Sequence, residues 1–259
     1  MPSRLVALVT GASAGIGKEL ARLLSVDHDL ILTARREAEL HALAAELSNC
    51  TCHVFPLDLA DPTGPKALFD AVAVKGLAVD VLVNNAGFGD LGPFAKADLG
   101  KMLRMIQLNV TALTELTGLF LPGMLSRKSG QILNVGSVAG FQPGPFMAVY
   151  YATKAFVNSF SEALANELAG TGVSVTCLCP GPTRSEFAKA AGMEQTELFT
   201  VGSVADTHSV ALAGVRAMKR GKRLIVTGFR NRALLFAERF LPRGMVISAV
   251  RWMQSRRQK

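Results

Sequence analysis

The chain has few of the residue types that stabilise small exported proteins or bind metal ions. Its 259 residues include four cysteines, four histidines and one tryptophan. The cysteines form two C-x-C pairs in strand-like runs, a spacing unlike the C-x2-C of zinc sites. We therefore expect free buried thiols in a reducing cytoplasm, and neither a disulfide framework nor a metal site. The residues concerned are Cys50, Cys52, Cys177 and Cys179, together with His28, His41, His53 and His208, which fit no catalytic spacing.

Long apolar runs are also missing. No uninterrupted apolar run reaches the roughly 18 residues that a membrane-spanning helix needs. The segment from Arg4 to Thr10 already reads as a core strand, so no signal peptide is indicated. These two observations favour a cytoplasmic protein.

Acidic residues are nearly absent from the C-terminal part of the chain. From Arg216 onward, 13 lysines and arginines face a single acid, Glu238, whereas the preceding 215 residues carry 15 basic and 19 acidic side chains. The tail therefore has a net charge of +12 and the body −4. Because the basic character belongs to the tail, the overall charge of +8 does not predict a nucleic-acid partner.

What the chain does have is a regular alternation of strand-like and helix-like segments. Short β-branched, apolar runs alternate with segments of helical period, which predicts a parallel sheet covered on both faces. The expected strands are 4–10, 29–34, 51–57, 79–84, 130–137, 173–178 and 223–226, and the expected helices are 15–26, 37–48, 63–74, 102–126, 150–168 and 204–219. We predict an α/β fold: a single Rossmann-type doubly wound sheet of about seven strands over residues 1–227. A basic amphipathic helical extension over 228–259 follows it.

A glycine-rich loop lies between the first expected strand and the first expected helix. Thr10 is followed by Gly11-Ala12-Ser13-Ala14-Gly15-Ile16-Gly17. Glycines allow a tight turn and a close backbone approach, and the start of a helix offers free N–H groups to a pyrophosphate. In this position the loop predicts a dinucleotide-binding site, although a merely tight turn would use the same glycines.

The residues at the end of the second expected strand indicate whether the site prefers NAD or NADP. NAD-selective sites place an acid about 20 residues after the glycine loop, to bind a ribose hydroxyl. Here that place holds Ala34, followed by Arg35 and Arg36. An arginine can instead bind a 2′-phosphate through two hydrogen bonds. The sequence therefore favours NADP over NAD, with Arg35 as the main phosphate ligand and Arg36 as a helper; both could also simply be solvated.

The only two tyrosines of the chain are adjacent, at Tyr150 and Tyr151. Tyr150 lies four residues before Lys154, so the two side chains share one face of a helix, and Tyr151 points elsewhere. An ammonium beside a phenol favours the phenolate and lowers a pKa of about 10. The spacing therefore predicts that Tyr150 exchanges protons, with Ser137 thirteen residues upstream at the end of a strand.

Together these motifs resemble the short-chain dehydrogenase/reductase family in its shorter form. The matching segments appear in the family's order: the loop at 10–17, Asp58-Leu59, Asn84-Asn85-Ala86-Gly87, Asn109, Ser137, Tyr150-x3-Lys154 and Pro180-Gly181. The carboxamide threonine of the family is Ser185 here, which keeps a hydroxyl, and the often basic position before Gly15 is Ala14.

The resemblance implies a role for each of these residues. Tyr150 would be the general acid or base, Ser137 would bind the substrate oxygen, Lys154 would bind the nicotinamide ribose, and Asn109 would support a water relay. The cofactor would contact Gly11, Ser13, Ala14, Gly15, Ile16, Gly17, Arg35, Arg36, Asp58, Leu59, Asn85, Ala86, Gly87, Tyr150, Lys154, Pro180, Gly181, Thr183 and Ser185. Asn84 is expected to brace the sheet. The resemblance also implies a homo-oligomer, a dimer or tetramer, formed through the long helices 102–126 and 150–168.

Aromatic side chains dominate the loops expected around the reacting group. Phe88, Phe94, Phe141, Phe146 and Phe187, with Ser137, are the expected substrate residues, although several could instead pack the loops onto the body. Since binding pockets are mostly apolar, we expect an apolar ketone, aldehyde or secondary alcohol. The predicted activity is NADP-dependent interconversion of a carbonyl and an alcohol. The alternative is a non-catalytic dinucleotide-binding sensor or scaffold with the same fold.

The tail carries two amphipathic runs, 233–241 and 245–253, separated by Pro242-Arg243-Gly244. Their arginines alternate with leucine, phenylalanine, isoleucine, valine and Trp252. Such a pair can pack on its own domain, pack on a second subunit, or lie on an anionic membrane surface. The sequence leaves these alternatives open.

Overall fold

The computed structural model describes residues 4–193, 196–200 and 204–255 of the chain. Seven parallel strands form one sheet in the order β3-β2-β1-β4-β5-β6-β7. The strands are β1 (Leu5–Thr10), β2 (His28–Thr33), β3 (Cys52–Phe55), β4 (Val81–Asn84), β5 (Gly130–Val135), β6 (Val173–Cys179) and β7 (Leu224–Val226). The predicted doubly wound parallel sheet of seven strands is confirmed.

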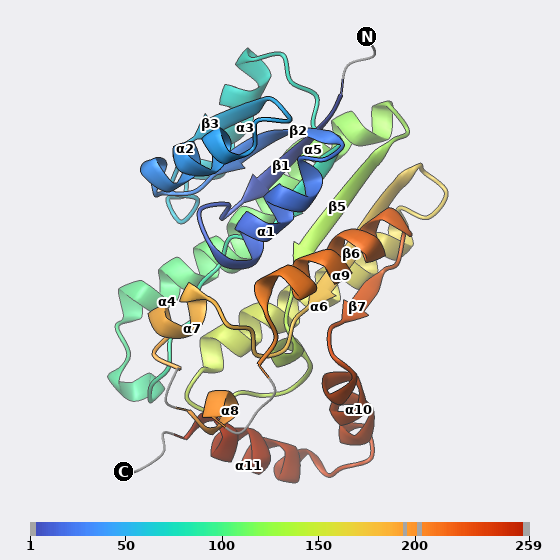
Figure 1. Ribbon diagram of the computed structural model, residues 1–259. Coiled ribbons are helices and arrows are strands. Elements are labelled where there is room, and N and C mark those ends of the chain that lie inside the picture. The colour runs from blue at the N-terminus through green and yellow to red at the C-terminus, as the bar shows by residue number, and fades with distance from the viewer. Residues whose placement is uncertain (1–3, 194–195, 201–203, 256–259) are drawn as a thin grey trace.

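Helices cover both faces of this sheet (Figure 1). They are α1 (Gly15–Leu24), α2 (Glu37–Glu46), α3 (Gly64–Val74), α4 (Leu99–Ile106), α5 (Leu113–Ser126), α6 (Ala148–Glu167), α7 (Glu186–Ala190), α8 (Glu197–Thr200), α9 (Thr207–Lys219), α10 (Phe229–Glu238) and α11 (Arg243–Gln254). Short 3-10 turns lie at Phe94–Lys96 and Val138–Phe141, and a π-helical segment, Gln107–Ala112, joins α4 to α5.

Alternate residues of each central strand face opposite layers of the core. In β1, Ala7 and Val9 pack with α1, α2 and α9, whereas Val6 and Leu8 pack with α3 and α5. Because both faces are buried, the central strands are apolar at successive positions. This is why the sequence shows continuous apolar runs and not an alternating pattern.

The continuous helical stretch Leu99–Ser126 is long and apolar enough, by length and composition alone, to cross a membrane. In this fold its second half, α5, packs on the sheet, where Leu116, Phe120 and Met124 are buried against the β-strands. A buried core helix passes the same test of length and composition.

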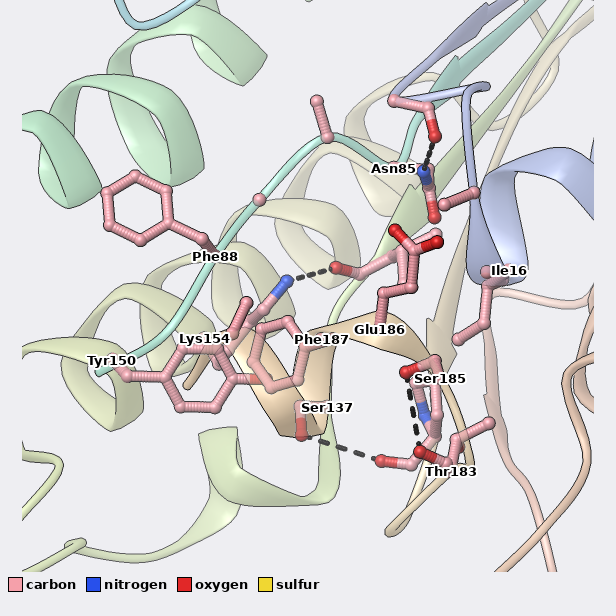
Figure 2. A pocket seen from close by; sticks show the side chains of 18 of the residues that line it. Ile16, Asn85, Phe88, Ser137, Tyr150, Lys154, Thr183, Ser185, Glu186 and Phe187 are labelled. Carbon is pink, nitrogen blue, oxygen red and sulfur yellow. Dashed lines mark hydrogen bonds between the residues drawn. The ribbon is translucent and has the colours of Figure 1, made fainter. Parts of the chain in front are cut away.

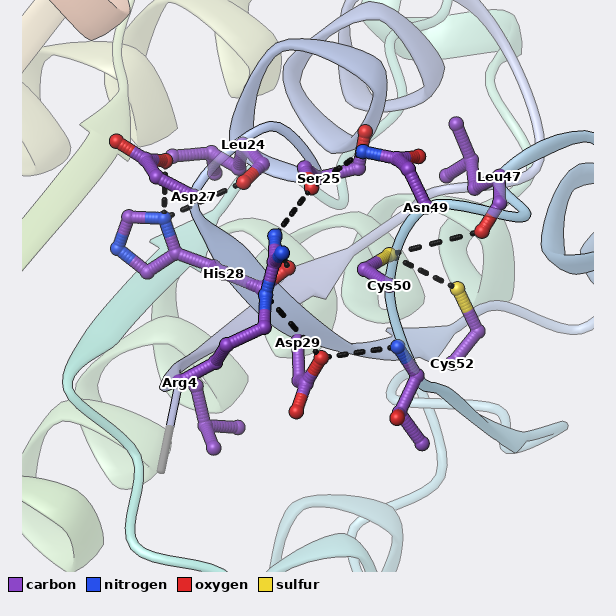
Figure 3. A network of polar contacts seen from close by, with 12 residues as sticks. Arg4, Leu24, Ser25, Asp27, His28, Asp29, Leu47, Asn49, Cys50 and Cys52 are labelled. Carbon is purple, nitrogen blue, oxygen red and sulfur yellow. Dashed lines mark hydrogen bonds and ion pairs between the residues drawn. The ribbon is translucent and has the colours of Figure 1, made fainter. Parts of the chain in front are cut away.

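A polar network joins the start of β1 to β2 and to the segment before β3 (Figure 3). Arg4 donates to the carbonyl oxygen of Ser25 at 2.7 Å and contacts Asp29, which in turn accepts from the backbone N–H of Thr51 at 2.9 Å. Cys50 and Cys52 lie here as free thiols with their sulfurs 3.7 Å apart. This network joins β1, β2 and the start of β3, and gives these residues a structural role.

Candidate functional site

The predicted motif residues meet at the carboxyl ends of the strands. β1 and β4 are neighbours there, and the order of the strands reverses between them, the place where doubly wound folds bind ligands. A cavity of about 530 Å³ lies at this edge. Figure 2 shows that its lining side chains come from the glycine loop, the segment after β4, the helix α6 and the segment after β6. Its volume is in the usual range for a small-molecule site.

The glycine loop has the geometry of a phosphate-binding turn. Gly11 and Gly15 have φ angles of +66° and +56°, a region that disfavours residues with a side chain. A Cβ on Gly17 would lie 2.3 Å from the Gly11 carbonyl oxygen, so Gly17 permits close packing but does not line the cavity. Asn85 supports the turn by donating to the carbonyl oxygen of Thr10 at 2.8 Å.

The start of α1 is open toward the cavity. Its N-cap, Ala14, makes no side-chain hydrogen bond to the helix, so its side chain satisfies none of the first N–H groups. Ser13, Ala14, Gly15 and Ile16 line the cavity at this point. A free helix start and a glycine turn fit a pyrophosphate.

The two arginines after β2 differ in their surroundings. Arg36 donates to Glu186 at 2.8 Å and to Ser13 at 3.3 Å, so a carboxylate from α7 already neutralises it. Arg35 also lines the cavity, and within the described chain it forms no ion pair. Arg35 is therefore the cation available to an added phosphate, which agrees with the prediction that it is the main phosphate ligand.

Asp58 and Leu59 are the residues that the family resemblance predicts beside the adenine. Both line the cavity, and Asp58 accepts from the backbone N–H of Ala60 at 2.9 Å and from Arg104 at 2.7 Å. Burial opposes the charge of Asp58, but these hydrogen bonds outweigh it and lower the pKa of the carboxyl. The carboxylate is therefore a fixed acceptor at this end of the cavity.

Tyr150, Lys154 and Ser137 come together at the other end of the cavity (Figure 2). Lys154 Nζ donates to the carbonyl oxygen of Val135 at 2.7 Å and lies 5.9 Å from the centre of the Tyr150 ring. The Ser137 hydroxyl accepts from the backbone N–H of Ala139 at 3.0 Å. All three side chains are buried, so the positions of their polar atoms are fixed by packing.

Asn109 is presented by the π-helical segment. It donates to the carbonyl oxygen of Phe88 at 3.0 Å and to Thr153 Oγ1 at 3.1 Å, and it accepts from the Phe88 N–H at 3.1 Å. Local π-helical geometry is common at functional sites. Asn109 does not line the cavity; it fixes the segment after β4 against the catalytic helix.

The pKa of the phenol is shifted opposite to the expected direction. Burial raises the pKa of Tyr150 well above its usual value, and the hydrogen bond with Ser137 only partly opposes this. Burial also lowers the pKa of Lys154 to about 8. The helical spacing accounts for the nearby ammonium alone, whereas the loss of water around both buried groups has the larger effect on both pKa values. A protonated phenol suits a general acid.

The segment after β6 borders the same cavity. Pro180, Gly181, Thr183 and Ser185 all line it, as do Ala86 and Gly87 from the segment after β4. The Thr183 hydroxyl donates to the Gly181 carbonyl oxygen at 2.9 Å, and Thr183 pairs with Ala205. The Gly181 carbonyl oxygen and Ala205 thus both hold Thr183 in place. A fixed turn is what the predicted binding of the nicotinamide carboxamide needs.

The expected aromatic lining is correct only in part. Phe88 and Phe187 line the cavity, and Phe187 lies 5.3 Å from Tyr150 between ring centres. Phe94 is 64% exposed, and Phe94 and Phe146 border a separate small cavity. Phe141 borders neither cavity. These three side chains therefore lie outside the main cavity, although Gln142 of the same loop as Phe141 and Phe146 lines it.

The predicted substrate residues do not include several side chains that line the cavity. Tyr151, Leu198 and Met253 are among them. Met253 belongs to α11 in the tail and follows Lys154 by 99 residues. No motif marks it, because an apolar residue on an amphipathic helix has the same pattern whether it faces a core or a ligand.

Comparison with known proteins identifies the family. The model of the short chain dehydrogenase family matches residues 5–196. The chain belongs to this family of oxidoreductases. The solved structure of a short-chain dehydrogenase from Sphingobium yanoikuyae in complex with NADPH superposes with a TM-score of 0.81 at 33% identity, over 91% of this chain and 94% of that one.

Two relatives in sequence are also informative. The NADP-dependent 3-hydroxy acid dehydrogenase YdfG of Escherichia coli is 37% identical over 68% of this chain and 72% of its own length. A very-long-chain 3-oxoacyl-CoA reductase of Phaeosphaeria nodorum is 39% identical over 66% of this chain, and the match spans only 53% of that longer protein. The NADP-dependent relative and the NADPH complex support the prediction of NADP as the cofactor.

Proposed function

We propose that this short-chain dehydrogenase reduces an apolar ketone or aldehyde with NADPH, and oxidises the corresponding alcohol in reverse. The observation that carries the proposal is the convergence of Tyr150, Ser137 and Lys154 at the apolar end of a cavity whose other end has a phosphate-binding turn and a free arginine. The non-catalytic alternative is disfavoured, because a sensor does not need a buried phenol, hydroxyl and ammonium in one cavity.

The residues have separable tasks. The Ser137 hydroxyl would hold the substrate oxygen beside the phenol, and Tyr150, protonated because burial raises its pKa, would give that oxygen its proton. Lys154 and the turn at 180–185 would fix the nicotinamide half, and the glycine loop and Arg35 the phosphates. When bound, the cofactor supplies the hydride. The protein supplies position, proton transfer and exclusion of water.

One assay tests both the reaction and the cofactor. NADPH and NADH oxidation are followed with a panel of ketones and aldehydes, for the natural chain and for Arg35→Ala. We expect the natural chain to turn over apolar carbonyls. In Arg35→Ala the KM for NADPH should be roughly 10- to 100-fold higher, since a charge-assisted bidentate contact contributes about 1.5–3 kcal/mol. The KM for NADH should change little. Equal losses for both cofactors would contradict the phosphate role.

We also propose that the chain forms a homo-oligomer through the long helical stretch 102–126, which includes part of α4 and all of α5, and through α6. Phe156 of α6 is 39% exposed and stacks on Phe160 with the ring centres 5.7 Å apart. Leu99, Leu103 and Ile106 of α4 add exposed apolar surface. Light scattering of the purified chain tests this proposal, and a monomeric mass would contradict it.

Another proposal concerns the outer surface of the tail: we propose that it contacts anionic membranes. α11 packs on its own domain through Val246 and Val250, but none of the residues of α10 is buried in the described chain. Phe229, Phe236 and Phe240 are 76%, 62% and 74% exposed, and arginines lie among them. Exposed aromatic residues beside cations suit a lipid interface with negative charge.

Vesicle co-sedimentation checks this contact. The natural chain should bind vesicles containing phosphatidylglycerol more strongly than neutral ones, and Phe236→Ser/Phe240→Ser should reduce that binding several-fold, because it removes the aromatic pair. Val74→Ser, which changes an exposed apolar residue on α3, is the matched control. Unchanged binding by the double variant would eliminate the membrane contact.

A further inference from the structure

The C-terminal helix α11 is part of the same apolar cluster as the catalytic tyrosine. Val246 and Val250 are buried with Tyr150, Tyr151 and Met193. Met253, one helical turn further, lines the cavity. The tail therefore forms a wall of the substrate end, in addition to any contact that its outer face makes.

A single buried hydrogen bond joins this wall to the catalytic helix. Gln254 Nε2 donates to the Tyr151 hydroxyl at 2.7 Å, across 103 positions of sequence. Gln254 is 2% exposed and Tyr151 is 6% exposed, so water does not replace this contact easily. Burial raises the pKa of Tyr151, which keeps its hydroxyl neutral.

The Tyr151 ring is held on its other side by backbone. A Cβ on Gly144 would lie 2.2 Å from that ring, so the ring lies directly against the glycine. The Tyr151 ring also meets the Tyr150 ring edge-on, with centres 6.1 Å apart. Tyr151 is therefore fixed between Gly144 and Gln254, beside the phenol that reacts.

The same end of α11 also reaches the segment after β6. The backbone N–H of Glu197 in α8 donates to the carbonyl oxygen of Ser255 at 3.4 Å, and α8 and α11 lie next to each other in Figure 1. Arg251 lies over the Phe146 ring, 4.9 Å from its centre. The end of α11 thus contacts three segments near the cavity: α6, α8 and the loop before α6. The position of α11 therefore affects the positions of all three.

Only one of the two polar atoms of the Gln254 amide has a hydrogen-bond partner among the described residues. Gln254 Oε1 is buried and has no hydrogen-bond partner among the described residues. An unpaired buried amide oxygen opposes docking of the helix, so the bond to Tyr151 is what compensates for burying this side chain. Breaking that bond should weaken the docking of α11 without touching the reacting groups.

We propose that Gln254 is a specificity-determining positioning residue: through Tyr151 it holds α11 and Met253 as the wall that binds the apolar body of the substrate. This inference rests on the proposed carbonyl reduction. The reacting carbonyl is bound by Tyr150 and Ser137, whereas the wall contacts only the part of a substrate that extends beyond them. Long apolar ketones therefore need the wall, and small ketones do not.

The test compares KM and kcat along a series of methyl ketones from butanone to dodecanone, with saturating NADPH. Gln254→Leu should raise the KM of the longest ketones by about tenfold, the effect of one lost buried hydrogen bond. Their kcat, and kcat/KM for butanone, should stay within about twofold, because the reacting groups do not move. Ser248→Ala, on the exposed side of the same helix, is the matched control.

Tyr151→Phe removes the other partner of the bond and should raise the KM of the long ketones similarly. The double variant should lose no more than either single one, because both changes break one interaction. If circular dichroism shows that Gln254→Leu does not fold, Tyr151→Phe alone tests the proposal. Additive losses, equal losses for short and long ketones, or an unchanged KM for the long ones would overturn the proposal.

A readout independent of activity separates this inference from the proposed reaction. Trp252, the only tryptophan of the chain, lies two residues before Gln254. Its fluorescence anisotropy should fall in Gln254→Leu and in Tyr151→Phe, as the end of α11 becomes more mobile, and should not change in Ser248→Ala. If no ketone is reduced by the natural chain, the proposed reaction fails while the anisotropy still decides whether the bond holds the helix. Unchanged anisotropy would show that it does not.

Discussion

Tyr150→Phe is expected to lower turnover by roughly 10²- to 10⁴-fold, the usual contribution of a general acid. The substitution removes one oxygen from a side chain that is 9% exposed, so the fold should be kept. The KM for NADPH should stay nearly the same, because the glycine loop and Arg35 are proposed to bind the other half of the cofactor. Single-turnover reduction of a reactive ketone is the direct measurement.

The matched control is the neighbouring phenol. Tyr151→Phe should retain turnover of a small ketone, because the Tyr151 hydroxyl faces Gln254 and not the reacting oxygen. Substantial turnover by Tyr150→Phe, or an equal loss in both variants, would show that Tyr150 is not the proton donor.

The pH profile gives a second check on the same group. Because burial raises the pKa of Tyr150, the phenol is protonated at neutral pH. Reduction should therefore be independent of this group through neutral pH and fall only in alkaline solution. Oxidation of the alcohol, which needs the phenolate, should increase with pH.

Lys154→Met should abolish most turnover and at the same time stabilise the fold. Burial lowers the pKa of Lys154 from 10.5 to about 8, so the folded protein binds this proton more weakly than the unfolded chain does. The cost of burying the ammonium is complete below pH 8 and vanishes above pH 10.5, and stability of the natural chain should increase between these values. A shift of this size corresponds to about 3 kcal/mol.

The net gain in Lys154→Met is smaller, because the Val135 carbonyl oxygen loses its donor, at a cost of about 1–2 kcal/mol. We expect the free energy of unfolding at neutral pH to increase by about 1–2 kcal/mol, measured by urea denaturation without cofactor. At pH 10 or above the gain should disappear. A variant that is less stable at neutral pH would contradict the account of the buried ammonium.

Much of the cofactor half of the site could be predicted from the sequence. Gly11 and Gly15 need a backbone conformation that few other residues adopt, and Tyr150 and Lys154 are joined by helical spacing. Such features are local, since they depend on residues a few positions apart. The carboxyl ends of parallel strands then bring them together, which the strand pattern already implies.

The substrate half could not be predicted in the same way. Phe94, Phe141 and Phe146 have the right residue type and stand outside the main cavity, because loop direction depends on packing between distant segments. The pKa of Tyr150 depends on burial, which one turn of helix does not reveal. The packing around each residue therefore decides both which side chains line the cavity and how far the pKa of Tyr150 is shifted.

The succession of strands and helices along the chain follows from the sequence pattern, and the structure confirms it. Short-range spacing also predicts the phosphate turn, the role of Arg35 and the choice of Tyr150 over Tyr151. Only the tertiary structure decided that α11 folds back on the catalytic helix, that Gln254 meets Tyr151, and that α10 keeps its aromatic side chains exposed. An amphipathic helix has the same pattern whether it packs on its own domain, a second subunit or a lipid surface. The choice depends on which apolar surface lies within reach once the chain is folded.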